Sequence, residues 1–160
     1  MEEISLKTYS LAASSFCNYN PQTLMAARLS IPFCLALTAV DGYITIQNFT
    51  KERVFDPKIR EVMRKIKVKG SPEFDKLYPE MFPAEVKVNL RSGVSYLEVE
   101  YFPKGSYKNP LTREELQNKF LSLATITFTI EQAKEIINTI NKLEKINKAS
   151  ELTNLLIKTR

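Results

Sequence analysis

Residues 103–120 read PKGSYKNPLTREELQNKF, and they join a tight loop to a strongly marked helix. The helix is predicted to begin after Thr112, because Thr112 and Glu115 have the spacing of a capping box. The loop before it carries Lys104 and Tyr107 on either side of a glycine and a serine. An ammonium group and a phenol close to a helix N-terminus are suited to holding a carboxylate or a phosphate. The alternative is a plain connection between a strand and a helix.

Two runs with alternating apolar residues precede this loop, Glu85 to Arg91 and Val94 to Phe102, and Ser92-Gly93 separates them. Such alternation around a short turn predicts an antiparallel hairpin. A two-residue turn places apolar opposite apolar and charge opposite countercharge. Its pairs are Val86 with Val99, Lys87 with Glu98, and Val88 with Leu97. A three-residue loop with a bulge is the alternative, and it shifts every pair.

Helix signals also occur before the hairpin. Asp56-Pro57 has the pattern of an N-cap and a first helical residue, and apolar residues follow at helical spacing to about Lys65. The period then changes, and residues 65–69 predict a short half-buried strand. Residues 22–40 predict one helix or two, since Ser30 is able to cap a second helix.

Three helices are predicted to follow the loop, with caps at Thr112, Thr129 and Ser150. Together the elements indicate an α+β fold: a small antiparallel sheet, made of the hairpin plus a short strand, packed with several helices. Asn20-Pro21 is a turn signal. Residues 1–20 are therefore expected to form an N-terminal arm, and residues 21–160 the α+β domain.

The composition is that of a folded globular protein, with 160 residues, 44% hydrophobic residues and 26% charged ones. The apolar run Ile31 to Val40 is about half of the roughly 20 residues that a membrane-spanning helix needs. The N-terminal residues lack a basic flank followed by a long apolar stretch. We therefore expect a cytoplasmic protein with no membrane segment.

The chain contains no histidine and two cysteines, Cys17 and Cys34, which are far apart in the sequence. Histidine is the commonest general base and metal ligand, so catalytic triads that use it are excluded within these residues. The cysteines fit buried, reduced thiols and not a metal-binding pair. We expect neither a metal nor a cofactor.

The densest basic block runs from Lys58 to Lys69 in a chain of net charge +5. Basic residues of this kind are able to bind phosphates. Here they alternate with apolar residues, which is typical of the solvated side of a partly buried element. We favour the solvated side and expect no nucleic-acid partner.

The stretch PKG, NPLT, an acidic pair and KF resembles the C-terminal domain of the MmgE/PrpD family. Further similar motifs occur in the same order along the chain, and among them are Asn20-Pro21, Ser30 to Phe33, and Phe82 to Val88. The resemblance covers about Pro21 to Leu156. Members of this family include 2-methylcitrate dehydratase and related enzymes of small polycarboxylic acids.

The resemblance implies a lid-like domain that normally accompanies a large all-helical domain, with the active site between the two. Leu6 to Ser10 is similar to the start of the family motif at the domain border, although Ser10 replaces its proline and no histidine follows. Lys7 is therefore a candidate catalytic residue that would bind or polarise a carboxylate. Lys104 and Tyr107 are candidate substrate-binding residues.

These features lead to the expectation of a partial MmgE/PrpD-like protein that lacks the N-terminal helical domain. Such a protein would be inactive alone or would be the small subunit of a split enzyme. Its expected partners are a helical-domain protein or a second copy of itself, and a small carboxylic acid once a site is completed. The alternative is a non-catalytic oligomerisation or interaction domain.

Overall fold

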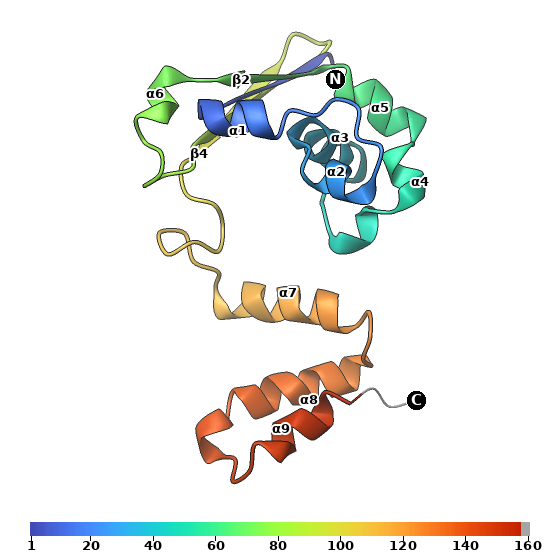
Figure 1. The fold of residues 1–160 in the computed structure, drawn as a ribbon, viewed down its shortest axis with the longest axis vertical. Coiled ribbons are helices and arrows are strands. Elements are labelled where there is room, and N and C mark those ends of the chain that lie inside the picture. Colours follow the sequence, from blue (N-terminus) through green and yellow to red (C-terminus); the bar gives the residue numbers. More distant parts are fainter. Residues whose placement is uncertain (158–160) are drawn as a thin grey trace. The chain divides into compact units, whose positions relative to one another are not determined.

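The computed structural model describes residues 1–157 of the chain. The chain forms two compact units, Met1–Pro103 and Lys104–Arg160, which are built from different elements (Figure 1). Among the described residues, no helix has the length and apolar character required to span a membrane.

A four-stranded mixed sheet forms the framework of the first unit. Its strands are β1 (Glu3–Thr8), β2 (Ile66–Gly70), β3 (Ala84–Asn89) and β4 (Ser95–Glu100). Their order across the sheet is β2-β1-β3-β4, with β1 parallel to β2 and antiparallel to β3, and β3 antiparallel to β4. The α+β class predicted from the sequence is confirmed, but the sheet is larger than the hairpin plus one strand.

Short helices make up the rest of the first unit. They are α1 (Ser10–Ser15), α2 (Leu24–Arg28), α3 (Ile31–Asp41), the 3-10 helix η1 (Ile46–Asn48), α4 (Lys51–Val54), α5 (Pro57–Met63) and α6 (Pro72–Asp75). The predicted caps of α3 and α5 are confirmed, because Ser30 accepts a bond from the Phe33 N–H and Asp56 accepts one from the Lys58 N–H.

The core lies between one face of the sheet and the helices α3 and α5. The inward side chains of the strands include Ile4 and Ile66, and buried residues of α3 and α5 pack against them. The fully buried members of the two helices include Phe33, Leu37, Ile59 and Met63. This packing buries Ile4, Leu6 and Ile66 on one face of the neighbouring strands β1 and β2, whereas most residues of the outer strand β4 are exposed.

The first strand corrects the prediction for residues 1–20. They do not form a separate arm, because β1 is an inner strand that pairs with both β2 and β3. Residues Glu3 to Thr8 alternate between half-buried and buried positions, with Ile4, Leu6 and Thr8 buried. That alternation is the sequence pattern of a half-buried strand.

The hairpin is present, but its register differs from the pairs predicted with a two-residue turn. Val86 lies opposite Glu98, and Val88 opposite Tyr96. Leu90 donates to the Val94 carbonyl across a three-residue loop, in which Gly93 has a φ of 84°. This is the alternative with the longer loop, and it is favoured because glycine adopts the left-handed conformation at little cost.

The second unit is helical, with α7 (Arg113–Ala124), α8 (Ile130–Ile140), the 3-10 helix η2 (Leu143–Lys145) and α9 (Ser150–Leu155). The capping box of Thr112 and Glu115 is complete, and Thr129 caps α8 through the Gln132 N–H. Ser150 is the first residue of α9 and not its cap, since the N-cap position belongs to Ala149.

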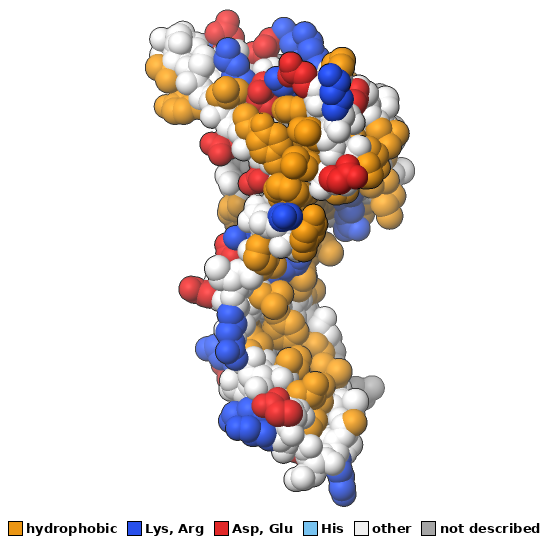
Figure 2. All heavy atoms as spheres, turned by 90° about the vertical axis from the view of Figure 1, so that its left-hand side faces the viewer, with side chains coloured by type: hydrophobic (Ala, Val, Ile, Leu, Met, Phe, Trp, Pro, Cys, Tyr) orange, Lys and Arg blue, Asp and Glu red, His pale blue; other side chains and the backbone are white. Residues whose placement is uncertain are grey.

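Few apolar side chains of this second unit are buried. Among its described residues, Ala133 and Ile136 are the buried ones, and both lie on α8. Many others are largely exposed, namely Leu116, Leu123, Ile126, Ile130, Ile140, Leu143, Leu156 and Ile157. Figure 2 shows hydrophobic side chains running along the helices of this unit. Its helices therefore have apolar faces that they do not cover themselves.

Candidate functional site

Lys7 lies near the end of β1, on the polar face of the sheet. It directly faces Glu85 of β3, and its Nζ is 3.1 Å from Glu85 Oε2. The same ammonium group is 5.1 Å from the centre of the Phe74 ring. Because the Lys7 side chain is 37% exposed, these contacts orient the ammonium group and leave it accessible to a ligand.

The short helix α6 contributes Phe74, which contacts Lys7, and Asp75, which binds Ser10 at the start of α1. The Phe74 side chain is buried, and the Lys7 ammonium group lies over its ring. The rings of Phe74 and Tyr101 pack edge to face, with 6.3 Å between their centroids. Asp75 accepts hydrogen bonds from the Ser10 N–H and the Ser10 hydroxyl. These two bonds lower the pKa of Asp75, so that it stays ionised and holds the start of α1 next to Lys7.

An aromatic cluster adjoins Lys7 along the chain. Tyr9 stacks on Tyr78 with 4.6 Å between ring centroids, and Phe82 packs edge-on against both. Burial, followed by the nearby Tyr78, raises the pKa of Tyr9, so its phenol remains protonated at neutral pH. Figure 2 shows hydrophobic side chains gathered on this side of the first unit, where α6 lies in Figure 1.

The chemistry that this end of the sheet can supply is anion binding next to apolar and phenolic surface. The Lys7 ammonium group is suited to a carboxylate, and Glu85 competes with a ligand for it. A lysine ammonium group supplies hydrogen-bond donors and no acceptor. Proton abstraction would need another group, and the chain contains no histidine.

Lys104 and Tyr107 lie in the second unit, in the loop before α7. Lys104 Nζ is 3.0 Å from Glu115 Oε2, which also accepts a bond from the Thr112 N–H. The bond from Thr112, followed by the one from Lys104, lowers the pKa of Glu115. Tyr107 is 79% exposed and its ring contacts the ammonium group of Lys108. Lys104 is therefore engaged by a carboxylate within its own unit.

This loop is ordered by its own backbone. Gly105 donates to the Asn109 carbonyl, and Asn109 donates to the Ser106 carbonyl. Gly105 has a φ of 94°, which few residues other than glycine adopt. Whether Lys104 and Tyr107 bind a substrate stays a prediction.

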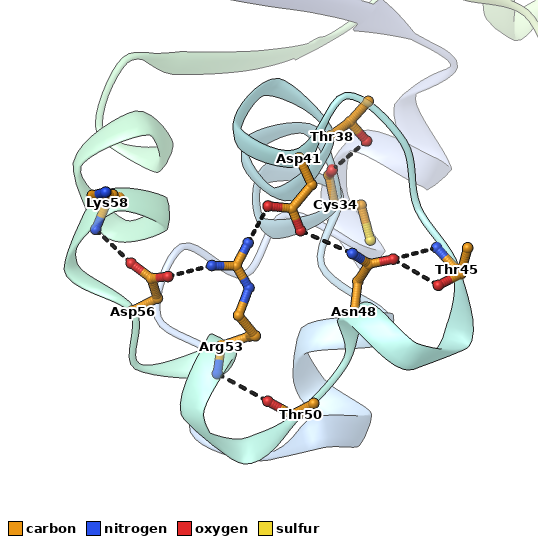
Figure 3. Close-up of polar contacts among 9 residues, drawn as sticks. All are labelled: Cys34, Thr38, Asp41, Thr45, Asn48, Thr50, Arg53, Asp56 and Lys58. Carbon is orange, nitrogen blue, oxygen red and sulfur yellow. Dashed lines mark hydrogen bonds and ion pairs between the residues drawn. The ribbon is translucent and has the colours of Figure 1, made fainter.

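A second polar group, shown in Figure 3, has a structural role. The guanidinium group of Arg53 contacts Asp41 at the end of α3 and Asp56 at the start of α5. Asn48 donates to the other oxygen of Asp41 and accepts bonds from the Thr45 N–H and hydroxyl. These contacts close the connection between α3 and α5, and their groups are already paired.

The sequence made Lys7 a candidate but did not indicate which residues surround it. Glu85 was visible only as a charged residue in a predicted strand, and its partner depends on the pairing of β1 with β3. Phe74 gave no signal, because it reaches the site from the short helix α6. Tyr101 was visible only as an aromatic residue of the predicted hairpin, and it lies directly after β4. The alternation in residues 3–8 is the pattern that would have placed Lys7 on a sheet.

Comparison with known proteins agrees with this architecture. Residues 1–145 match the model of the MmgE/PrpD C-terminal domain, so the match includes β1 and Lys7. The first unit is thus an α+β structure whose sheet carries an accessible lysine on its polar face. The chain belongs to the MmgE/PrpD family.

Several relatives with described activities are cis-aconitate decarboxylases. The chain is 30% identical to that of Mus musculus over 140 residues, which are 85% of this chain and 28% of the mouse protein. It is 27% identical to that of Homo sapiens over 134 residues, covering 81% of this chain and 27% of the human protein. With that of Aspergillus terreus it shares 26% identity over 153 residues, covering 92% of this chain and 31% of the fungal protein. The chain thus spans less than a third of the length of these relatives.

Proposed function

We propose that this chain forms one domain of a lyase that acts on a small di- or tricarboxylic acid, with Lys7 as a ligand for a substrate carboxylate. The observation that carries the proposal is the similarity to cis-aconitate decarboxylases over most of the chain. The accessible ammonium group of Lys7, held by Glu85 and Phe74, supports the role of that residue.

The remaining catalytic groups belong, in this proposal, to a helical domain, either on a longer polypeptide or on a separate chain. Decarboxylation and dehydration both require proton transfer by a positioned acid or base. The 160 residues contain no histidine and align with less than a third of the related enzymes. The exposed apolar residues of α7 and α8, with Leu156 and Ile157 after α9, support a helical partner, because such surface usually marks a contact.

The first test is turnover and binding of cis-aconitate by the purified chain. We expect no release of CO₂ above background, and a weak, saturable change in the NMR signals of the amides around Lys7. Lys7→Gln should weaken this binding several-fold. Lys87→Gln is the matched control, because Lys87 is an exposed lysine on the same strand as Glu85.

Two results would contradict the proposal. Robust turnover by the chain alone would show that no helical domain is needed. Equal weakening by Lys7→Gln and Lys87→Gln would show general charge attraction in place of a site at Lys7.

A non-catalytic role in oligomerisation is the second candidate, and the exposed apolar residues of the second unit favour it. In this case the apolar faces of α7 and α8 would pair between copies of the chain. Light scattering over a range of protein concentrations tests this: a dimer or larger assembly supports it, and a monomer at every concentration rules it out.

A further inference from the structure

A hollow on the first unit lies between the segment that precedes α2 and the helices α4 and α5. Its volume is about 400 Å³, which is within the range of small-molecule sites. Polar and aromatic side chains make up most of its lining: Tyr19, Asn20, Gln22, Phe55, Arg60 and Arg64. The buried Met63 completes it. The lining contains two guanidinium groups and no carboxylate.

Arg60 is held in place by neutral partners. Its Nε donates to the Val54 carbonyl, one Nη to Asn20 Oδ1 and the other Nη to the Pro21 carbonyl. Its guanidinium group also lies 5.8 Å from the centre of the Phe55 ring. Four contacts fix the geometry of this half-buried cation, yet none of them brings a negative charge. Such a preorganised cation loses little freedom when an anion binds.

Arg64 adds a second positive charge to the same side of α5, because residues four apart in a helix are neighbours. It is exposed, and within residues 1–157 neither Arg60 nor Arg64 forms an ion pair. The acidic residues nearest to Arg60 and Arg64 in the sequence form ion pairs with other cations. Glu61 forms its ion pair with Lys65 and interacts with Arg64 only as a weaker, more distant charge, and Asp56 binds Arg53 and the Lys58 N–H. Two like charges at this spacing repel each other, and a bound anion relieves that repulsion.

The walls of the hollow are suited to the uncharged part of a ligand. Phe55 and Tyr19 are each nearly half exposed. The Tyr19 hydroxyl is fixed at the edge of β2, where it donates to the Ile66 carbonyl and accepts from the Val68 N–H. Its ring position is therefore set by the sheet, and its aromatic surface remains available beside the arginines.

We propose that this hollow binds a small organic anion, whose phosphate or carboxylate group lies between Arg60 and Arg64 and whose flat apolar part contacts Phe55 and Tyr19. Guanidinium groups bind both kinds of oxyanion through paired N–H donors. The site is separate from Lys7 and does not depend on the lyase proposal. It also gives two cations of the basic block a specific role, while Lys65 and Lys67 of that block are paired with Glu61 and Glu3.

The test is an NMR titration of the full chain with phenyl phosphate, benzoate, benzyl alcohol and inorganic phosphate. We expect saturable shifts at the amides of residues 19–22 and 55–64 with one or both aromatic anions, weaker ones with inorganic phosphate, and none with benzyl alcohol. Whichever aromatic anion binds more tightly identifies the anionic group of the natural ligand and supports the site.

Arg64→Gln should weaken binding of that anion about tenfold, the effect of losing one charge-assisted contact. Lys58→Gln is the matched control, because it removes one exposed charge from the same helix, and Lys7→Gln should also leave binding unchanged. Thermal unfolding verifies that each variant is folded. Equal weakening by Arg64→Gln and Lys58→Gln, or an absence of saturable shifts with both aromatic anions, overturns the proposal.

Discussion

Arg53 lies on α4 but connects two other helices, α3 and α5. It bridges the last residue of α3, Asp41, and the N-cap of α5, Asp56 (Figure 3). The hydrogen bond to Asp41 is the main cause of the raised pKa of Arg53. All three side chains are partly shielded from solvent, with exposed fractions of 19 to 27%. The electrostatic attraction between these charges is therefore screened less by solvent than that of a fully exposed pair.

Arg53→Met should lower the free energy of unfolding by about 1 to 2 kcal/mol, because it leaves two partly shielded carboxylates near each other without their cation. Arg53→Lys should cost less, since it keeps the charge but loses the fork that reaches both carboxylates. Urea unfolding of the three proteins measures the difference. If Arg53→Met unfolds at the wild-type urea concentration, the bridge does not stabilise the fold.

At the scale of elements, α1 depends on a residue from α6. Tyr9, at the N-cap position of α1, makes no capping bond with its side chain. Asp75 supplies this function from a distant part of the chain by accepting bonds from Ser10. The close packing continues at Gly70, where a Cβ would lie 2.9 Å from Ser10 Cα. The end of β2, α1 and α6 thus form one structural group around the candidate site.

This contact predicts how stability changes with pH. The backbone bond and then the hydroxyl bond from Ser10 lower the pKa of Asp75 below its ordinary value of 3.8. The stabilisation is therefore complete above pH 3.8, the pKa expected in the unfolded chain, and is lost as the pH falls through the folded pKa. Asp75→Asn should lower the unfolding temperature at pH 7, and the difference from wild type should shrink below pH 3.8.

Glu73→Gln provides the control for this pH prediction, because Glu73 is an exposed carboxylate of the same helix α6. Calorimetry of the wild type and the two variants between pH 7 and acid makes the comparison. A difference between wild type and Asp75→Asn that stays constant with pH would show that Asp75 does not act through its charge.

At the scale of the whole molecule, the two units differ in how much core they possess. The first unit buries large side chains of α3 and α5 such as Phe33, Leu37 and Ile59. In the described part of the second unit the buried side chains are Ala133 and Ile136. A unit of this size rarely reaches high stability without a larger core or a partner surface.

Hydrogen exchange on the full chain should therefore separate the units. The amides of α3 and α5 should exchange more than about 100-fold more slowly than those of α7 and α9, after correction for intrinsic rates, because local stability follows burial. Mass spectrometry of peptic peptides measures this directly. Equal protection in the two units would mean that the second unit has a stability that its buried side chains do not explain.

Much of the local structure could be predicted from the sequence. Ser30, Asp56, Thr112 and Thr129 each begin a helix where expected, because a cap acts on N–H groups within about three residues. The order of the motifs along the chain likewise identified the MmgE/PrpD family, which the match over residues 1–145 confirms. These signals are carried by residues that are close in sequence.

Only the tertiary structure placed β1 inside the sheet, brought Glu85 to Lys7 and gathered Tyr19, Phe55 and Arg60 around one hollow. Each of these contacts joins segments that are far apart in the chain. Strand pairing and side-chain packing depend on which distant segments meet, and the local pattern of a segment fits several partners equally well. The sequence alone thus determined the starts of α3, α5, α7 and α8 and the family, whereas the surroundings of Lys7 and of the arginine pair were decided when the chain folded.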